Sequence, residues 1–271
     1  MPASLARSYL FVPGNRPERF DKACGAGADA VIIDLEDAVP PAEKVQARAA
    51  VSAWLTAAQP VLVRINSADS EWFADDLALC AAAGVAGIVL PKAERTDDIN
   101  RIMARGAHAV LPLIETAQGM WQAHALAKVS GVQRLMFGSI DFQLDAGIDG
   151  ELDELLYFRS QLVLVSRVAR IQAPVDGVTV ALDDVEQLCA DTRRARRLGF
   201  GGKLCIHPRQ VEPVNRCFSP SANDIAWARR VLLAAAAANG AAVALDGKMV
   251  DLPVIRKAQE IANEARRRKL L

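Results

Sequence analysis

Acidic and basic side chains follow short apolar runs at several places in this sequence. After successive runs, the polar residues are Asp34, Glu36 and Asp37; Arg64 and Asn66; Lys92; Glu115; and Asp141. A helix-like stretch separates each run from the next. This rhythm is typical of a parallel β/α barrel, whose strands are apolar throughout and whose chemistry lies at their carboxyl ends. Two isolated carboxylates and an arginine at one barrel mouth predict a divalent metal that holds an anionic substrate.

Glu115 and Asp141 follow consecutive predicted strands, so we expect them to lie side by side. Mg²⁺ typically takes one or two carboxylates and leaves its other positions to water and substrate oxygens. Glu36 and Asp37, which follow an earlier strand, are expected to bind metal-bound waters or to orient the ligands. A single acid at a strand end more often caps the next helix. Four such acids with an arginine at one face favour the metal site.

Arg64 closes the apolar run over residues 61–63. A guanidinium at this point is suited to stabilise an enolate or thioester oxygen as negative charge develops on it. The alternative is an ion pair with Glu36 or Asp37, and the two roles are compatible.

Several other candidate residues carry weaker signals. Arg16, Arg19 and Lys22 could meet a phosphate-bearing ligand at a helix N-terminus, although each alone is more often a solvated surface charge. Lys92 is a candidate Schiff-base lysine, but a metal-dependent site favours an ionic or hydrogen-bonding role. His207 follows an apolar run and precedes a proline, and a lone histidine in that position is more often a structural residue than a base. The sequence shows neither a hydrolase triad nor a Gly-rich phosphate loop.

The composition excludes several classes of protein. The 271 residues carry 32 Lys and Arg and 32 Asp and Glu, so the formal net charge is +0 and no basic field attracts nucleic acid or membrane. No apolar run reaches the roughly 20 residues that span a bilayer, and the N-terminus lacks a signal-peptide pattern. The 5 scattered cysteines predict neither a disulfide framework nor a zinc site. We therefore expect a cytoplasmic protein.

Short apolar runs alternate with helical patterns along most of the chain. The predicted strands lie near residues 8–12, 30–34, 61–65, 87–90, 110–114, 134–137, 174–178 and 202–206. The predicted helices cover 16–27, 41–57, 71–83, 96–105, 117–129, 151–171 and 183–198. Eight such strands predict a TIM-type (β/α)8 barrel over residues 1–218.

The pattern changes in residues 219–271, which predict a C-terminal helical extension. A turn at 219–224 starts an Ala-rich helix that is expected to end at Asn239–Gly240, and a short segment over 241–251 leads into a final helix. Such an extension often caps a neighbouring subunit or an active site. A solvated surface helix with a cationic end is equally compatible with the charges.

Seven segments of the chain resemble the citrate lyase β-subunit-like proteins of the HpcH/HpaI aldolase and malyl-CoA lyase superfamily. They are 7–15 (RSYLFVPGN), 33–39 (IDLEDAV), 63–66 (VRIN), 90–94 (LPKAE), 113–117 (LIETA), 199–203 (GFGGK) and 206–208 (IHP). The match runs in order over nearly the whole chain. It implies a β/α barrel that uses Mg²⁺ to cleave or form a carbon–carbon bond next to an acyl thioester.

The resemblance also implies roles for individual residues. Glu115 and Asp141 match the metal ligands of the family, and Arg64 matches its substrate-binding arginine; Glu115 also contacts substrate. The positions that match the surroundings of coenzyme A are Phe11, Arg16 and Lys22.

The late segment 247–253 (GKMVDLP) resembles one in the CoA-lyase branch of the family. There an aspartate from a neighbouring subunit serves as acid and base, which implies this role for Asp251 and a homotrimer or a dimer of trimers. Two segments depart from the family. Residues 138–142 (GSIDF) lack an acidic neighbour of the metal ligand, and 174–179 (PVDGVT) differ from citrate lyase proper. Both departures argue against citrate itself as the substrate.

The expected activity is cleavage or formation of a β-hydroxyacyl-CoA such as citramalyl-CoA or malyl-CoA. The products would be acetyl-CoA and an α-keto acid, either pyruvate or glyoxylate. The alternatives are a citryl-thioester lyase subunit, a malyl-CoA thioesterase, a metal-dependent aldolase of the pyruvate type and a non-catalytic scaffold.

Overall fold

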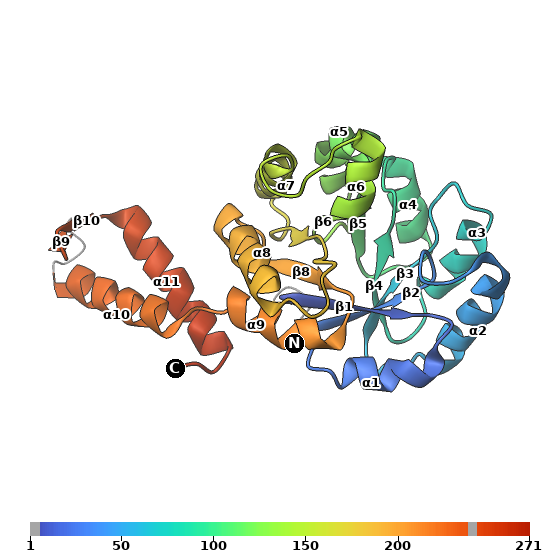
Figure 1. Cartoon of the computed structure of the whole chain (residues 1–271), viewed down its shortest axis with the longest axis horizontal. Helices are drawn as coiled ribbons and strands as arrows, with labels where there is room; N and C mark the ends of the chain where they lie inside the picture. Colours follow the sequence, from blue (N-terminus) through green and yellow to red (C-terminus); the bar gives the residue numbers. More distant parts are fainter. Residues whose placement is uncertain (1–5, 238–242) are drawn as a thin grey trace. The chain divides into compact units, whose positions relative to one another are not determined.

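Eight parallel strands close into a barrel in the order of the sequence, as Figure 1 shows. The computed structural model describes residues 6–237 and 243–271. The strands are β1 (Ser8–Pro13), β2 (Ala30–Asp34), β3 (Val61–Arg64), β4 (Val85–Leu90), β5 (Val110–Ile114), β6 (Met136–Phe137), β7 (Val175–Asp176) and β8 (Gly202–Cys205). The last strand pairs with the first, with Tyr9 opposite Leu204. The predicted TIM-type barrel is confirmed.

Helices connect the strands around the outside of the barrel. They are α1 (Phe20–Cys24), α2 (Lys44–Trp54), α3 (Phe73–Asp76), α4 (Thr96–Ala104), α5 (Ala117–Ala127), α6 (Ser139–Ala146), α7 (Leu156–Ala169), α8 (Val185–Leu198) and α9 (Val211–Phe218). Short 3-10 turns are η2 (Pro17–Arg19), η3 (Pro41–Glu43), η4 (Leu77–Leu79) and η5 (Pro208–Gln210). The helix expected over 71–83 is replaced by α3 and η4, and the one expected over 151–171 begins only at Leu156.

The interior of the barrel is packed with apolar side chains. The side chains that form this core are Tyr9, Ile32, Leu62, Val89, Leu111, Leu113, Met136, Val175 and Leu204. The buried guanidinium of Arg134 donates hydrogen bonds to the Tyr9 hydroxyl at 2.8 Å and to the backbone carbonyls of Ala6 and Ala173 at 3.0 and 2.8 Å. These carbonyls precede β1 and β7, so the arginine ties strand starts together. The carboxyl ends of the strands are left for chemistry.

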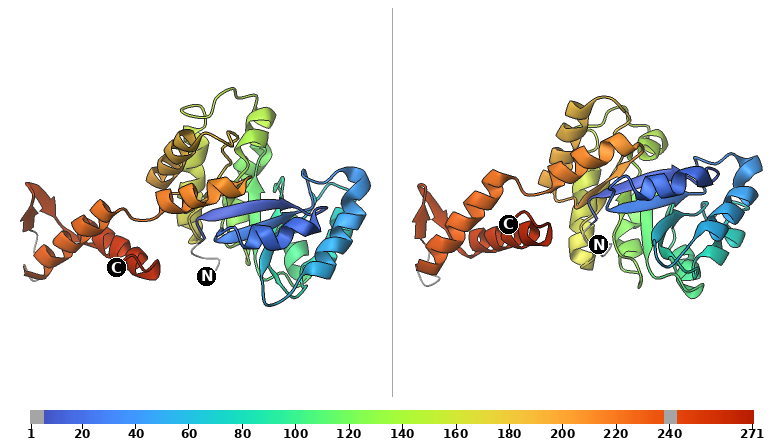
Figure 2. Two further views of the ribbon diagram at one scale, coloured as in Figure 1. Left: turned by 60° about the horizontal axis from the view of Figure 1, so that its bottom comes forward. Right: turned by 90° about the horizontal axis from the view of Figure 1, so that it is seen from below.

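Residues 216–271 form a compact unit of their own, separate from the unit of residues 1–215. Its elements are α10 (Ala222–Ala237), β9 (Val243–Leu245), β10 (Lys248–Val250) and α11 (Leu252–Arg267). The two helices lie side by side, which the views of Figure 2 show, and β9 and β10 pair as an antiparallel hairpin. Its core contains Ala228, Val231, Val250 and Ala258.

The C-terminal helical region that the sequence predicts is therefore present. The expected end of its first helix at Asn239–Gly240 lies outside the described residues. Packing of this region on a neighbouring subunit stays a prediction. In the described parts of the chain, every helix is too short or too polar to cross a membrane.

Candidate active site

A cavity of about 380 Å³ opens at the carboxyl ends of the strands. Its charged lining comes from β2, β3, β5 and the helix after β6, and consists of Asp34, Asp37, Arg64, Glu115 and Asp141. Its apolar lining includes Phe11 of β1, Leu113 of β5 and Leu204 of β8, together with Val178 and Ile206, which follow β7 and β8. The cavity therefore suits a ligand with one charged end and one less polar part.

Arg64 is the last residue of β3 and lies opposite Asp34, the last residue of β2, in the strand register. Its guanidinium donates two hydrogen bonds to the Asp34 carboxylate, at 2.7 and 2.6 Å. Its Nη1 atom lies 3.0 Å from Oε2 of Glu36 and 3.2 Å from Oδ2 of Asp37. Burial opposes the charge of Arg64, but these carboxylates outweigh burial and raise its pKa. The side chain stays a fixed cation, with its Cζ atom 4.8 Å from the centre of the Phe11 ring.

Asp34 organises the loop after β2, although the sequence did not single it out as a site residue. Its Oδ1 atom accepts a hydrogen bond from the Glu36 amide at 2.9 Å, and its Oδ2 atom accepts one from the Ala38 amide at 3.0 Å. The same carboxylate thus shapes the loop and holds Arg64. One signal could have found it, because Asp34 and Arg64 both end apolar runs that form adjacent strands.

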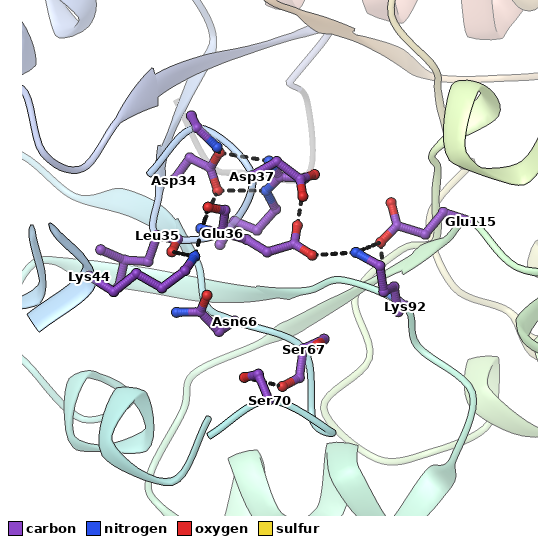
Figure 3. A network of polar contacts seen from close by, with 12 residues as sticks. Asp34, Leu35, Glu36, Asp37, Lys44, Asn66, Ser67, Ser70, Lys92 and Glu115 are labelled. Carbon is purple, nitrogen blue, oxygen red and sulfur yellow. Dashed lines mark hydrogen bonds and ion pairs between the residues drawn. The ribbon is translucent and has the colours of Figure 1, made fainter. Parts of the chain in front are cut away.

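Lys44, at the start of α2, supports this loop from beneath. Its ammonium donates to the backbone carbonyls of Leu35 and Glu36, both at 2.9 Å, as Figure 3 shows. The lysine is buried and its nitrogen lies 5.0 Å from the centre of the Trp72 ring. Such a buried donor fixes the path of the backbone that presents Glu36. No sequence pattern marked Lys44 for this role.

Glu115 directly follows β5, and only 1% of its surface is exposed. Its Oε1 atom accepts a hydrogen bond from the Lys92 amide at 2.7 Å. A Cβ atom at Gly138 would lie 2.6 Å from its Oε2 atom, so the glycine leaves room for the carboxylate. Burial, and then the neighbouring Glu36 charge, raise the pKa of Glu115 to about 8. A bound cation would stabilise the ionised form of this carboxylate.

Asp141 lies in the first turn of α6 and lines the same cavity as Glu115. The sequence suggested that Asp141 directly follows a strand. In the structure it lies in a helix instead, because β6 ends at Phe137 and α6 begins at Ser139. Glu115 and Asp141 both line this cavity, and the charge of Asp141 adds to the effects of burial and of Glu36 that raise the pKa of Glu115. The structure thus brings the two predicted metal ligands to one site.

The donor set fits Mg²⁺. Among the described residues, no group of three or more His, Cys, Asp or Glu side chains is arranged to hold a metal by itself. Mg²⁺ does not need such a cage, because one or two carboxylates suffice when water and substrate supply the other oxygens. The buried carboxylate of Glu115, with Asp141 beside it in the cavity, provides this kind of site.

Lys92 follows β4, and its ammonium lies between two carboxylates, as Figure 3 shows. The nitrogen is 2.5 Å from Oε1 of Glu36 and 4.0 Å from Oε1 of Glu115. Burial opposes its charge, but the hydrogen bond to Glu36 outweighs burial and raises the pKa of Lys92. A protonated amine is a poor nucleophile, so this geometry favours the ionic role over a Schiff base.

The residues expected near coenzyme A are only partly brought together. Phe11 lines the cavity, whereas Arg16 and Lys22 are exposed and lie outside its lining. Arg16 precedes η2 and Lys22 lies in α1, so both belong to the connection that follows β1. Their contact with a phosphate-bearing ligand stays a prediction.

Asp251 and His207 both cap helices. Asp251 lies in the unit of residues 216–271, where its Oδ1 atom accepts a hydrogen bond from the Val254 amide at 3.3 Å at the start of α11. His207 accepts a hydrogen bond from the Arg209 amide through Nδ1 at 3.2 Å, which supports the structural reading of this histidine. The catalytic role expected for Asp251 stays a prediction.

Comparison with known proteins agrees with this geometry. The chain is 39% identical to the citrate lyase subunit beta-like protein of Deinococcus radiodurans over an alignment of 279 residues. This alignment covers 96% of this chain and 97% of that relative. It is 36% identical to the (3S)-malyl-CoA thioesterase of Cereibacter sphaeroides over 266 residues, and this alignment covers 94% of this chain and 93% of that relative.

A solved structure is similar over the whole chain. The protein CitE from Mycobacterium tuberculosis, in complex with magnesium, acetoacetate and coenzyme A, matches with a TM-score of 0.87 and 34% identity, over 98% of this chain and 99% of that one. Its magnesium is consistent with the predicted Mg²⁺ dependence. The model of the HpcH/HpaI aldolase/citrate lyase family matches residues 7–208. These findings indicate a lyase and confirm the resemblance seen in the sequence: the chain belongs to the HpcH/HpaI aldolase/citrate lyase family.

Proposed function

We propose that this protein is a Mg²⁺-dependent lyase that cleaves or forms a β-hydroxyacyl-CoA such as citramalyl-CoA or malyl-CoA. The products of cleavage are acetyl-CoA and an α-keto acid, either pyruvate or glyoxylate. One observation carries the proposal: Arg64, fixed by Asp34, shares a cavity of about 380 Å³ with the carboxylates of Glu115 and Asp141. The complex of the CitE protein with magnesium, acetoacetate and coenzyme A supports it.

Glu115 and Asp141 are the residues that would hold the metal. When bound, Mg²⁺ supplies Lewis acidity and a template for the carboxylate and hydroxyl of the substrate. Glu115 is suited to this task because its burial and its short hydrogen bond from the Lys92 amide fix the carboxylate in place. Substrate oxygens complete the site, so Glu115 also takes part in substrate binding.

Arg64 has the electrostatic role in this proposal. The substrate hydroxyl group gives its proton to water. The carbon that bears this hydroxyl becomes the carbonyl carbon of the keto acid as the carbon–carbon bond breaks. The electron pair of the broken bond passes to the acetyl thioester as an enolate. The fixed guanidinium of Arg64 stabilises the negative charge on the enolate oxygen. Because Asp34 already orients the side chain, little reorganisation is needed during the reaction.

Asp251 of a neighbouring copy completes the reaction by giving a proton to the enolate carbon, and it removes this proton in the reverse direction. The assembly proposed with this role is a homotrimer or a dimer of trimers. Phe11 contacts the coenzyme A portion, and the exposed cations Arg16 and Lys22 face its phosphates. The proposed location is the cytoplasm.

A panel of hydroxyacyl-CoA esters tests the proposal directly. Citramalyl-CoA, malyl-CoA and β-methylmalyl-CoA are incubated with the protein and Mg²⁺, and acetyl-CoA, propionyl-CoA, pyruvate and glyoxylate are quantified. Propionyl-CoA is included because β-methylmalyl-CoA cleaves to propionyl-CoA and glyoxylate. We expect one keto acid and the matching acyl-CoA in equal amounts, acetyl-CoA from citramalyl-CoA or malyl-CoA, with no product when EDTA is added or when Glu115 is replaced by Gln. Absence of a keto acid for every ester would overturn the lyase proposal.

Thioester hydrolysis is the second candidate, because the (3S)-malyl-CoA thioesterase of Cereibacter sphaeroides is 36% identical to this chain. In that reaction water attacks the thioester carbonyl, and free coenzyme A and a free hydroxy acid leave. The same product analysis separates the two. Free coenzyme A with an intact hydroxy acid indicates hydrolysis, whereas acetyl-CoA with a keto acid indicates the lyase.

A further inference from the structure

Lys92 has a backbone conformation that lysine rarely adopts. Its φ angle is +45°, which lies in the left-handed region where a side chain is strained. Strain of this kind persists where the surrounding structure imposes it, and it gathers at functional sites. Here the unusual conformation is accompanied by a specific contact, because the Lys92 amide donates its hydrogen bond to Oε1 of Glu115 at 2.7 Å.

The side chain of the same residue holds a different carboxylate. Its ammonium lies 2.5 Å from Oε1 of Glu36, while Nη1 of Arg64 lies 3.0 Å from Oε2 of Glu36. Each oxygen of Glu36 therefore faces a cation. Glu36 is 6% exposed and is absent from the cavity lining, unlike Asp34 and Asp37 on either side of it in the loop.

Glu36 and Glu115 both lie within 4.0 Å of the Lys92 ammonium nitrogen. The ammonium thus occupies the position from which a cation would bridge these two carboxylates. Without it, Glu36 would be a third acid beside the pair of Glu115 and Asp141. A third carboxylate favours Ca²⁺, which takes 6–8 oxygen ligands, over Mg²⁺, which is satisfied by one or two carboxylates and water.

The geometry points to Lys92 as the positioning residue that keeps Glu36 out of the metal coordination sphere and so makes the site selective for Mg²⁺. Its backbone orients the ligand Glu115, and its ammonium neutralises the competing carboxylate. This inference rests on the proposed function, since it assumes that Glu115 and Asp141 bind the metal. It assigns Lys92 no proton transfer and no contact with substrate.

A purely structural ion pair predicts the opposite result on mutation from the one expected here. Removing a structural lysine would loosen the site and weaken metal binding. Removing a residue that excludes Glu36 takes away a positive charge near the metal and frees a carboxylate, and both changes strengthen divalent-ion binding. The sign of the change in affinity therefore decides between the two.

Isothermal titration of the full chain with Mg²⁺, Mn²⁺ and Ca²⁺ provides the measurement. We expect Lys92→Met to lower the Kd for Mn²⁺ at least about threefold and to lower the Kd for Ca²⁺ more than that for Mg²⁺. Lys92→Gly is the second variant, because glycine accepts a positive φ and retains the amide that binds Glu115. The double variant Lys92→Met/Glu36→Gln should lose the increase in metal affinity that Lys92→Met alone produces. Lys128→Met, an exposed lysine at the end of α5, is the control with the same change in charge.

Three results are decisive. If the wild-type protein binds no metal, or if Glu115→Gln leaves metal binding unchanged, the proposed metal site itself is wrong. If Glu115→Gln abolishes binding but Lys92→Met and Lys92→Gly leave the Kd values unchanged or raise them, only the role of Lys92 fails. A gain in affinity that survives Glu36→Gln would also overturn it, because Glu36 is the carboxylate that Lys92 is inferred to exclude.

Discussion

At the scale of single residues, the site depends on how Arg64 is held. Two parallel hydrogen bonds join its guanidinium to Asp34, which is 1% exposed, while a third nitrogen faces Glu36 and Asp37. Such a fork fixes both the direction and the plane of the cation. A cation oriented before the reaction stabilises developing charge without the cost of reorganisation.

Arg64→Lys retains the positive charge but removes the fork, so it tests orientation separately from charge. We expect kcat to fall by about 10²-fold, because a lysine cannot make two parallel bonds to Asp34 and point at the enolate oxygen at once. The KM for the acyl-CoA should change much less. Steady-state kinetics measure both, with Arg101→Lys on the exposed surface of α4 as the control. A KM that rises as much as kcat falls would contradict this division.

The pKa of Glu115 gives a prediction for the metal-free protein. This pKa is raised from 4.5 to about 8. Between these two pH values, the folded state therefore holds a proton on Glu115 that the unfolded state has released. The stability from this proton is fully present below about pH 4.5 and is lost as the pH rises through about 8. We expect the unfolding free energy of wild type, relative to Glu115→Gln, to decrease by a few kcal/mol between these limits.

Urea unfolding in EDTA at several pH values measures this difference. Added Mg²⁺ should restore stability to the wild type at pH 8, because a bound cation compensates the ionised carboxylate, and should leave Glu115→Gln unchanged. A difference that is flat across the range would show that the Glu115 carboxyl is not perturbed by its surroundings.

At the scale of elements, buried strands could be predicted because they form continuous apolar runs. The sequence did not show that Asp141 lies in a helix, since β6 has only two residues and α6 follows it after the single residue Gly138. The contact of Lys92 with Glu36 joins residues 56 positions apart, so it depends on how two loops meet in space. Asp34 ends a strand like Arg64, but only the strand register shows that the two are paired.

The turn between β6 and α6 positions Glu115 through Gly138. Its φ of −87° is acceptable for alanine, but the added Cβ would lie 2.6 Å from Oε2 and 2.7 Å from Cβ of Glu115, so the whole Glu115 side chain must shift. We expect the variant to fold and to bind Mn²⁺ at least about tenfold more weakly, because the carboxylate must move. Titration calorimetry measures the affinity and thermal unfolding the stability. Gly25→Ala, whose Cβ would have ordinary contacts at 3.4 Å, is the matched control.

At the scale of the whole molecule, the role proposed for the unit of residues 216–271 comes from a resemblance and not from the sequence pattern alone. Its helices, its hairpin and the cap at Asp251 account for its fold without any reference to catalysis. The resemblance of residues 247–253 to the CoA-lyase branch is what predicts that Asp251 acts in a neighbouring copy. Asparagine caps helices about as well as aspartate, so Asp251→Asn removes the proposed acid and base while α11 keeps its cap.

Complementation between two inactive variants tests the shared site. Arg64→Ala and Asp251→Asn should each be inactive alone. In a trimer where Asp251 serves a neighbouring barrel, mixed assemblies contain some sites with both native residues. Purification through both tags keeps only trimers that contain both variants. In either such trimer, one barrel of the three has a native Arg64 and receives a native Asp251 from its neighbour, so activity should recover to about a third of wild type. Co-expressed, differently tagged chains purified through both tags, followed by assay for acetyl-CoA, make the measurement. If Asp251 instead acts on the barrel of its own chain, every site in the mixture lacks one residue and the activity stays at the level of the single variants.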